Sequence, residues 1–290
     1  MRVAVVGATG TIGRPLTHAL ARTHDVVGVA RHLPEQDDAG VRWIAADATD
    51  ETAVRTALEG VDVVYHLVHS LGSSDYEERD RAAAKSVADG AAAVGASQVV
   101  YLGGLGEQAA DLSAHLRSRA ETAAILASGS VPLTTLRAAM IVGPGSAAFE
   151  TIRALVERLP VMVCPRWVSV ETQPVALVDV LAALVGVCGE PGTYGETFDL
   201  GGPEVMTYRT MMERTARALG KRPILIEVPF LTPRLSSLWL HLVTPANVSV
   251  ARPLVEGLRT PTVAHDERIW TLVRTRRTTF DEAVSTTLRD

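Results

Sequence analysis

Three evenly spaced glycines follow a short apolar run at the start of the chain, and this pattern constrains the fold more than any other. Residues 3–16 read VAVVGATGTIGRPL, with Gly7, Gly10 and Gly13 three residues apart. Between a strand and a helix, the first glycine permits a tight turn, the second lets a pyrophosphate approach the backbone, and the third lets helix and strand pack closely. The N–H groups of residues 9–12 would then face the phosphates at the positive end of the helix dipole. The segment predicts a dinucleotide-binding turn, and a tight turn without a ligand is the alternative.

Apolar runs and alanine-rich stretches alternate through the first 145 residues. The runs are continuous, which is typical of parallel strands that are buried on both faces, and they occupy residues 3–6, 26–30, 43–45, 61–68, 99–102 and 133–142. Stretches with the length and spacing of crossover helices lie between them, at residues 13–23, 52–59, 76–94 and 117–128. This alternation predicts an α/β fold built on a Rossmann-type doubly wound parallel sheet.

The pattern loosens after residue 145. We expect helices over residues 149–159, 178–188 and 207–219 and a short strand over 196–200, with Thr207 as an N-cap and Gly220 as a helix stop. The sequence therefore predicts an NAD(P)-binding core over residues 1–145 and a smaller mixed C-terminal lobe over 146–290. Within that lobe, residues 170–190 are expected to return to the core.

Composition excludes several classes of function. The net charge is −5 and aromatic residues make up only 4% of the 290 residues, so neither the charge nor the base-stacking surface of a nucleic-acid-binding protein is present. The two cysteines, Cys164 and Cys188, are too few for a disulfide framework, which favours a reducing, cytoplasmic location. No apolar run is long enough to span a bilayer. Residues 235–245 are apolar but short, and a helix that covers a core or a dimer contact is favoured over one on a membrane surface. The oligomeric state stays open.

The second predicted strand ends in basic residues. Dinucleotide-binding proteins place an acidic residue there for the 2′-hydroxyl of NAD, whereas an arginine suits the 2′-phosphate of NADP. This chain has Arg31 at that place, and Arg14 follows the third glycine. NADP(H) is therefore the preferred cofactor, with NAD(H) possible, and the alternative is that both arginines are solvated surface residues.

Several further segments carry a resemblance to a known family. Asp47 follows the third predicted strand, and the other segments are HLVHS (66–70), YLGGLG (101–106), HLRSRAET (115–122), LRAAMIVGPG (136–145) and PRWVSVETQPVALVDVL (165–181). With the glycine turn, they resemble the extended and atypical short-chain dehydrogenase/reductases. More narrowly, they are similar to an NAD(P)H-binding subgroup related to the nitrogen-metabolite-repression-like (NmrA-like) regulators and to the accessory nucleotide-binding subunit of respiratory complex I.

The resemblance implies a set of cofactor-binding residues. Those implied for the pyrophosphate are Gly7, Thr9, Gly10, Thr11 and Ile12, with Gly13 completing the turn. Asp47 and Ala48 would flank the adenine, with Asp47 accepting a hydrogen bond from its exocyclic amine. The residues implied for the ribose groups and the approach to the nicotinamide follow two neighbouring strands and are Leu67, Val68, His69, Leu102 and Gly103.

The chain departs from the family at the catalytic positions. Typical members use a Tyr-x-x-x-Lys pair and a serine or threonine, whereas here the matching positions hold His115 and Arg119, and the strand end carries Gly103 and Gly104. A histidine that titrates near neutrality can donate a proton, and an arginine can hold ribose hydroxyl groups. His115 and Arg119 are thus the candidate catalytic residues. The alternative is that His115 caps the helix and Arg119 pairs with Glu121 or a distant carboxylate.

No motif for hydrolase or metal chemistry is present. His66 and His69 have no third ligand in view, so no metal is expected. The preferred interpretation is a reductase that uses NADP(H) on a small apolar or quinone-like substrate. Residues of the C-terminal lobe able to enclose such a ligand are Met162, Arg166, Trp167 and Tyr208. The alternative is a non-catalytic NADP(H)-binding redox sensor or assembly protein, favoured by the loss of tyrosine, lysine and serine together.

Overall fold

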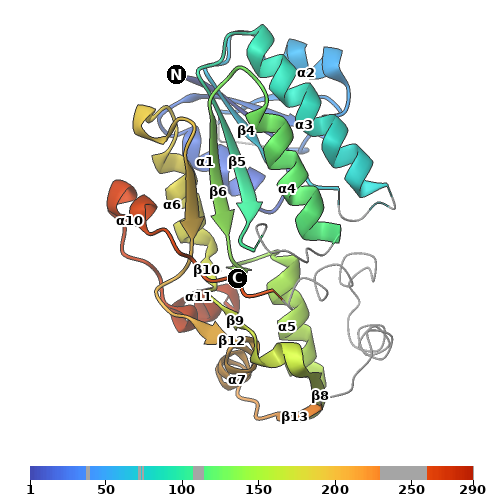
Figure 1. The fold of residues 1–290 in the computed structure, drawn as a ribbon, viewed down its shortest axis with the longest axis vertical. Helices are drawn as coiled ribbons and strands as arrows, with labels where there is room; N and C mark the ends of the chain where they lie inside the picture. Colours follow the sequence, from blue (N-terminus) through green and yellow to red (C-terminus); the bar gives the residue numbers. More distant parts are fainter. Residues whose placement is uncertain (37–39, 71–72, 74, 107–113, 229–259, 290) are drawn as a thin grey trace.

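A parallel sheet of seven strands organises the computed structural model, which describes residues 1–36, 40–70, 73, 75–106, 114–228 and 260–289 (Figure 1). The strand order is β11-β6-β5-β4-β1-β2-β3. Six strands come from the first half of the chain: β1 (Arg2–Val6), β2 (Asp25–Ala30), β3 (Arg42–Ala45), β4 (Val63–His66), β5 (Gln98–Gly104) and β6 (Leu133–Ala138). After β3 the chain crosses to the other side of β1, so the order of the strands reverses between β1 and β4. The predicted doubly wound α/β sheet is confirmed.

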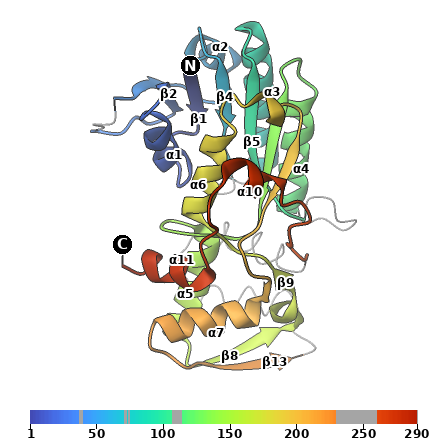
Figure 2. The same cartoon turned by 90° about the vertical axis from the view of Figure 1, so that its left-hand side faces the viewer.

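Helices cover both faces of this sheet, because its strands are apolar on both sides. Val3 and Val5 of β1 face α1 (Gly13–Leu20), α6 (Leu177–Gly186) and α10 (Arg268–Val273). Ala4 and Val6 face α2 (Glu51–Ala57), α3 (Tyr76–Ala93) and α4 (Ala114–Ala127). Figure 2 shows α1 and α6 on one side of the strands and α3 and α4 on the other. A continuous apolar strand is thus matched by two apolar clusters.

The C-terminal half contributes to the same core. Strand β11 (Thr197–Leu200) pairs in parallel with β6, and Tyr65 of β4 donates a hydrogen bond to the carbonyl of Leu184 on α6 over 2.7 Å. Arg137 of β6 and the buried Asp199 of β11 form an ion pair of 2.6 Å. Sequence elements after residue 145 therefore complete the sheet and one of its faces, and the division of the chain at that residue stays a prediction.

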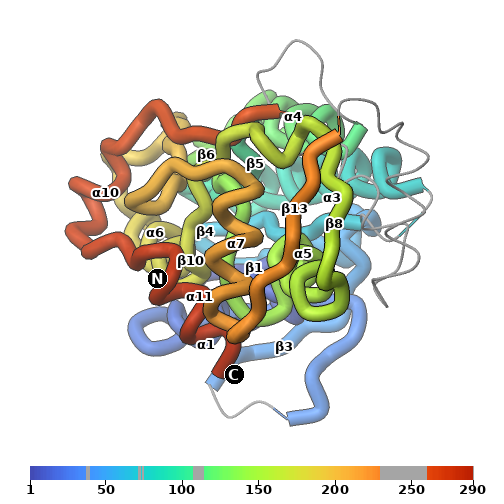
Figure 3. Tube along the Cα trace, turned by 90° about the horizontal axis from the view of Figure 1, so that it is seen from below, coloured from blue at the N-terminus to red at the C-terminus, as the bar shows by residue number. Residues whose placement is uncertain are grey.

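The remaining elements lie beyond the carboxyl ends of the strands, around a third apolar cluster. They are β7 (Ile141–Val142), α5 (Ala147–Arg158), β8 (Val161–Pro165), η1 (Arg166–Ser169), β9 (Glu171–Thr172), β10 (Val175–Ala176), β12 (Met206–Thr207), α7 (Tyr208–Ala218), β13 (Ile224–Val228) and α11 (Phe280–Thr287). The short helix η2 (Pro191–Thr193) instead lies at the amino ends of β5 and β6, where the Thr134 hydroxyl donates to the carbonyl of Thr193. In the view from below, α5, α7, β8 and β13 lie in front of the sheet (Figure 3). This lobe faces the sheet edge at which doubly wound folds bind ligands.

The structure confirms the expected cap and stop of α7 and changes the bounds of two predicted strands. Thr207 caps α7 by accepting a hydrogen bond from the N–H of Thr210, and Gly220 follows the helix at a φ of +69°. The run 61–68 ends as a strand at His66, and the run 133–142 divides into β6 and β7. The apolar run 235–245 lies outside the described residues. Across the described part of the chain, no helix has both the length and the apolar character needed to cross a membrane.

Candidate functional site

The glycine turn joins β1 to α1, and two of its glycines are required by the backbone itself. Gly7 has a φ of +94°, which side chains with a Cβ rarely adopt. A Cβ on Gly13 would lie 2.1 Å from the carbonyl oxygen of Gly7, so any side chain there would push the helix off the strand. A Cβ on Gly10 would meet only the Gly7 carbonyl oxygen, at 3.3 Å. Gly10 therefore faces open space, as the approach of a pyrophosphate requires.

The N–H groups of the turn are largely free to bind an anion. Those of Thr9, Thr11 and Ile12 have no acceptor among the described residues. The N–H of Gly10 differs from the expectation, because it donates to the carbonyl of Gly7 over 3.1 Å and closes the turn. Helix α1 has no capping side chain and no acidic residue in its first turn, so its own residues leave the positive end of its dipole without a countercharge.

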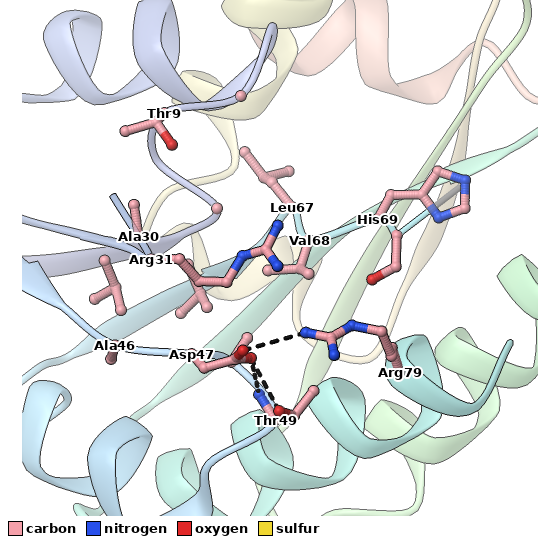
Figure 4. Close-up of a pocket in the computed structure, with 16 residues that line it drawn as sticks. Thr9, Ala30, Arg31, Ala46, Asp47, Thr49, Leu67, Val68, His69 and Arg79 are labelled. Carbon is pink, nitrogen blue, oxygen red and sulfur yellow. Dashed lines mark hydrogen bonds and ion pairs between the residues drawn. The ribbon is translucent and has the colours of Figure 1, made fainter. Parts of the chain in front are cut away.

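A pocket opens beside this turn at the carboxyl ends of the strands (Figure 4). The predicted cofactor residues that line it are Gly7, Thr9, Gly10, Arg31, Asp47, Ala48, Leu67, Val68 and His69. Predicted residues that do not line it are Thr11, Ile12, Gly13, Leu102 and Gly103. The pocket thus collects the ends of β1, β2, β3 and β4, on both sides of the point at which the strand order reverses.

Two arginines in the pocket have different surroundings. Arg79 on α3 donates to Asp47 Oδ2 over 3.1 Å, while Asp47 Oδ1 accepts from the N–H and hydroxyl of Thr49. The hydrogen bond from the Thr49 N–H, with that hydroxyl and Arg79, lowers the pKa of Asp47 despite its partial burial. Arg31 is exposed and has no hydrogen-bond or ion-pair partner in the part of the chain that the structure describes. Sequence reasoning missed Arg79, because arginines in a charged helical run such as EERDR are usually solvated.

The candidate catalytic residues lie next to the pocket, on α4. The ring of His115 is centred 5.0 Å from the ring of His69. Burial first, then the charges of His69 and Arg119, lower the pKa of His115 to about 3. The expectation that His115 titrates near neutrality is therefore wrong: the protein interior disfavours its charged form, and the sequence alone does not reveal that burial.

Arg119 is turned toward β5. Its guanidinium donates to the carbonyl of Leu102 and lies 4.9 Å from the centre of the Tyr101 ring. Glu121, the partner considered for Arg119, instead accepts two hydrogen bonds from Arg81, the shorter of them 2.7 Å. Arg119 thus keeps its charge beside the end of β5, where the nicotinamide ribose was expected.

The aromatic residues of the C-terminal lobe do not form the expected substrate pocket. Met162 and Tyr208 are buried in the apolar cluster of the lobe, and Trp167 packs edge-on against Tyr208 with ring centres 6.0 Å apart. These side chains stabilise the lobe by packing against one another. Among the described residues, Met162 and Tyr208 are each only 3% exposed, so they offer almost no surface to a substrate.

Comparisons with known proteins agree with this geometry. A family model described as NAD(P)H-binding matches residues 7–146. The (4-alkanoyl-5-oxo-2,5-dihydrofuran-3-yl)methyl phosphate reductase of Streptomyces griseus is 31% identical over 236 residues, which cover 78% of this chain and 76% of that protein. An uncharacterized protein of Mycobacterium tuberculosis is 41% identical over 102 residues, 35% of this chain and only 12% of that longer protein.

A solved structure shows the same fold over nearly the whole chain. The NADPH-dependent quinone oxidoreductase of Escherichia coli, in complex with NADPH, superposes with a TM-score of 0.79. The match covers 99% of this chain and 100% of that one, at 22% identity. At that identity the likeness concerns the fold alone.

Proposed function

The chain belongs to the atypical short-chain dehydrogenase/reductases that bind NAD(P)H, and from this membership we propose that it is an NADP(H)-dependent reductase of a small, apolar or quinone-like substrate. One relative supports the reaction class, and one structural neighbour shares the fold. The Streptomyces relative is named as a reductase, and the structural neighbour from Escherichia coli is an NADPH-dependent quinone oxidoreductase.

The pocket at the glycine turn carries the proposal, because its groups fit a dinucleotide. Open space in front of Gly10 and the unpaired N–H groups of Thr9, Thr11 and Ile12 suit a pyrophosphate. Asp47 retains acceptor capacity toward an adenine amine, since a carboxylate has about four acceptor positions. When bound, the nicotinamide group would supply a hydride.

The preference for NADP(H) rests on Arg31. Its guanidinium lines the pocket beside the end of β2 and has no partner among the described residues. A 2′-phosphate would give it the charge-assisted, bidentate partner that guanidinium groups favour. NAD(H) would leave this cation unpaired but exposed to water, so weaker binding of NAD(H) remains part of the proposal.

Residues beyond the pocket would serve the nicotinamide end. Leu102 and Gly103 at the end of β5 would lie beside its ribose, and Arg119 would keep a positive charge there because arginine does not release its proton. His115, with a pKa of about 3, would act as a neutral ring that accepts or donates a hydrogen bond. The two free cysteines support a cytoplasmic location.

The second candidate function is a non-catalytic NADP(H) sensor or assembly protein. It is favoured by the absence of the family's tyrosine and lysine together with the low pKa of His115. The two candidates share the cofactor and differ in whether the bound cofactor is oxidised.

Two measurements separate these possibilities. In calorimetric titrations, we expect NADPH to bind about tenfold or more tightly than NADH, as one charge-assisted contact implies. The NADPH-loaded protein, mixed without oxygen with a panel of quinones and enones, should then lose the absorbance of the reduced nicotinamide in a single turnover. Tight NADPH binding without oxidation would favour the sensor, and failure to bind either dinucleotide would contradict both candidates.

A further inference from the structure

A cluster of buried polar side chains lies between the pocket and α4. His69 follows β4, Asp80 lies on α3 and His115 lies on α4, so three separate segments bring these groups together. Nε2 of His69 and Nδ1 of His115 are both buried, and neither has a hydrogen-bond partner among the described residues. Buried polar atoms are nearly always paired in folded proteins. Two unpaired imidazole nitrogens, on rings whose centres lie 5.0 Å apart, therefore indicate a place at which a polar ligand atom binds.

Asp80 holds the His69 ring in one orientation. Its Oδ2 lies 2.7 Å from His69 Nδ1, and its Oδ1 accepts the N–H of Ser70 over 2.8 Å. The Asp80 side chain is only 2% exposed. Because the carboxylate can only accept hydrogen bonds, Nδ1 must carry the proton, which leaves Nε2 as the titrating atom. This is the arrangement in which a carboxylate orients a proton-transferring histidine.

The charges around the ring decide its protonation. Burial raises the pKa of Asp80, but the hydrogen bond from His69 and those from Ser70 outweigh burial and hold that pKa below its ordinary value. Burial and the charge of Arg119 lower the pKa of His69, while Asp80 opposes them. His66 below and His115 beside it remain neutral, since burial lowers the pKa values of these rings to about 4 and about 3. His69 and His115 both carry an unpaired ring nitrogen, but of these two rings only that of His69 has a carboxylate, Asp80, at hydrogen-bond distance.

His69 also lies at the correct end of the pocket. His69 lines the pocket, and its ring points away from Arg31 and Asp47 (Figure 4). On the proposed assignment, the adenosine end of the cofactor lies at Arg31 and Asp47. The ring therefore points away from the adenosine side and lies beside His115 of α4, 5.0 Å between ring centres. Arg119 of the same helix donates to the carbonyl of Leu102 near the end of β5, where the hydride would be transferred.

We propose that His69 exchanges the proton that accompanies hydride transfer, with Asp80 as the positioning residue that holds its ring; this inference rests on the proposed reductase function. In the reductive direction, the substrate's carbonyl carbon receives a hydride from NADPH. The Nε2–H bond of protonated His69 breaks and an O–H bond forms on the substrate oxygen. The products are an alcohol and NADP⁺, and neutral His69 regains a proton from water.

The first test concerns the ligand-free protein and does not depend on turnover. Long-range ¹H–¹⁵N NMR correlations should show His69 protonated on Nδ1 and unprotonated on Nε2 at neutral pH. Asp80→Asn places an amide donor against Nδ1 and should reverse this tautomer and lower the pKa of His69. The matched control is Asp89→Asn on the exposed side of the same helix, which should change neither. A wild-type His69 with its proton on Nε2, or a titration that Asp80→Asn leaves unchanged, would overturn the pairing.

The second test measures the reaction. His69→Gln should lower turnover by about 10²–10⁴-fold, as expected for loss of a general acid, while NADPH affinity changes only a few-fold. Asp80→Asn should move the pH profile of turnover to lower pH, because the acid form of His69 becomes scarcer. His24→Gln, a partly buried histidine at the opposite end of the sheet, is the control and should keep the wild-type rate.

The two proposals fail in different ways. An active wild type whose His69→Gln variant keeps its rate would overturn the role of His69 alone. If the wild type binds NADPH but none of the substrates tested leads to its oxidation, both the reductase function and the proton transfer are overturned. This holds even if His69 has the expected tautomer. If Asp80→Asn lowers turnover at every pH without shifting the pH profile, Asp80 has only a structural role and its positioning role is overturned.

Discussion

Arg79 on α3 reaches across the pocket to Asp47 and donates a hydrogen bond to its carboxylate over 3.1 Å (Figure 4). The contact ties the first turn of a helix to the segment after β3. On the opposite wall, Arg31 has no partner among the described residues. The pocket therefore contains one arginine whose charge is used by the protein and one whose charge is available to a ligand.

Arg31→Ala should weaken NADPH binding selectively. Loss of one charge-assisted contact to a 2′-phosphate corresponds to about 1.5–3 kcal/mol, or roughly 10–100-fold in the dissociation constant. NADH, which lacks that phosphate, should bind the variant with nearly its wild-type affinity. Calorimetric titration of both dinucleotides checks this, with Arg55→Ala on the exposed face of α2 as the control. An equal loss for NADPH and NADH would mean that Arg31 does not read the phosphate.

Arg79→Ala should act differently, because it removes the partner of Asp47. The pair is partly exposed, with 30% and 39% of the two side chains accessible, so its loss should cost only about 0.5–1 kcal/mol. Since Asp47 is proposed to contact the adenine that both cofactors share, NADPH and NADH should weaken by the same two- to fivefold factor. Unequal effects on the two dinucleotides would place Arg79 at the 2′-phosphate instead.

Much of the fold could be predicted because its signals are local. Continuous apolar runs mark strands that are buried on both faces, and six of the seven strands of the sheet lie on such runs. The ends of these strands were less predictable. Residues 67–70 remain apolar in part after β4 ends, because Leu67 and Val68 line the pocket while the N–H of Leu67 still donates to Val6 of β1.

The site was predictable only where its residues follow strands. Arg31 comes directly after a predicted strand and Asp47 two residues after one, and both line the pocket. Arg79 and Asp80 come from the middle of the chain segment EERDRAAA, which has the composition of a solvated helix. Only the crossover of α3 onto the sheet places them against β3 and β4. The low pKa of His115 has the same origin, because its burial depends on neighbours far apart in sequence.

Gly10→Val should abolish dinucleotide binding and leave the fold intact. A side chain at this position meets only the Gly7 carbonyl oxygen at 3.3 Å, but it fills the space in front of the turn. Gly13→Ala is the contrasting variant, because its Cβ would lie 2.1 Å from that same oxygen. It should lower the stability by roughly 1–3 kcal/mol, as forced overpacking does. Titration with NADPH and urea unfolding of both variants check the contrast, and NADPH binding by Gly10→Val within a few-fold of wild type would remove the pyrophosphate from this turn.

His66→Phe should make the protein less sensitive to acid. His66 is fully buried, neither ring nitrogen has a hydrogen-bond partner, and burial, followed by the charge of Arg119, lowers its pKa to about 4. Because this pKa lies below the unfolded value, the unfolded state binds more protons between pH 6.5 and 4. The contribution of His66 to stability is therefore complete above that window and is lost as the pH falls through it, by about 1.4 kcal/mol for each pH unit.

Phenylalanine keeps a ring that can stack on Tyr101, as His66 does with ring centres 6.0 Å apart, and has no group to protonate. Urea unfolding at pH 7 and pH 4.5 should show near-equal stabilities at neutral pH and a loss on acidification that is smaller in the variant by roughly 2–3 kcal/mol. A variant that loses as much stability as the wild type would show that acid acts elsewhere in the molecule, with His115 as the next residue to replace.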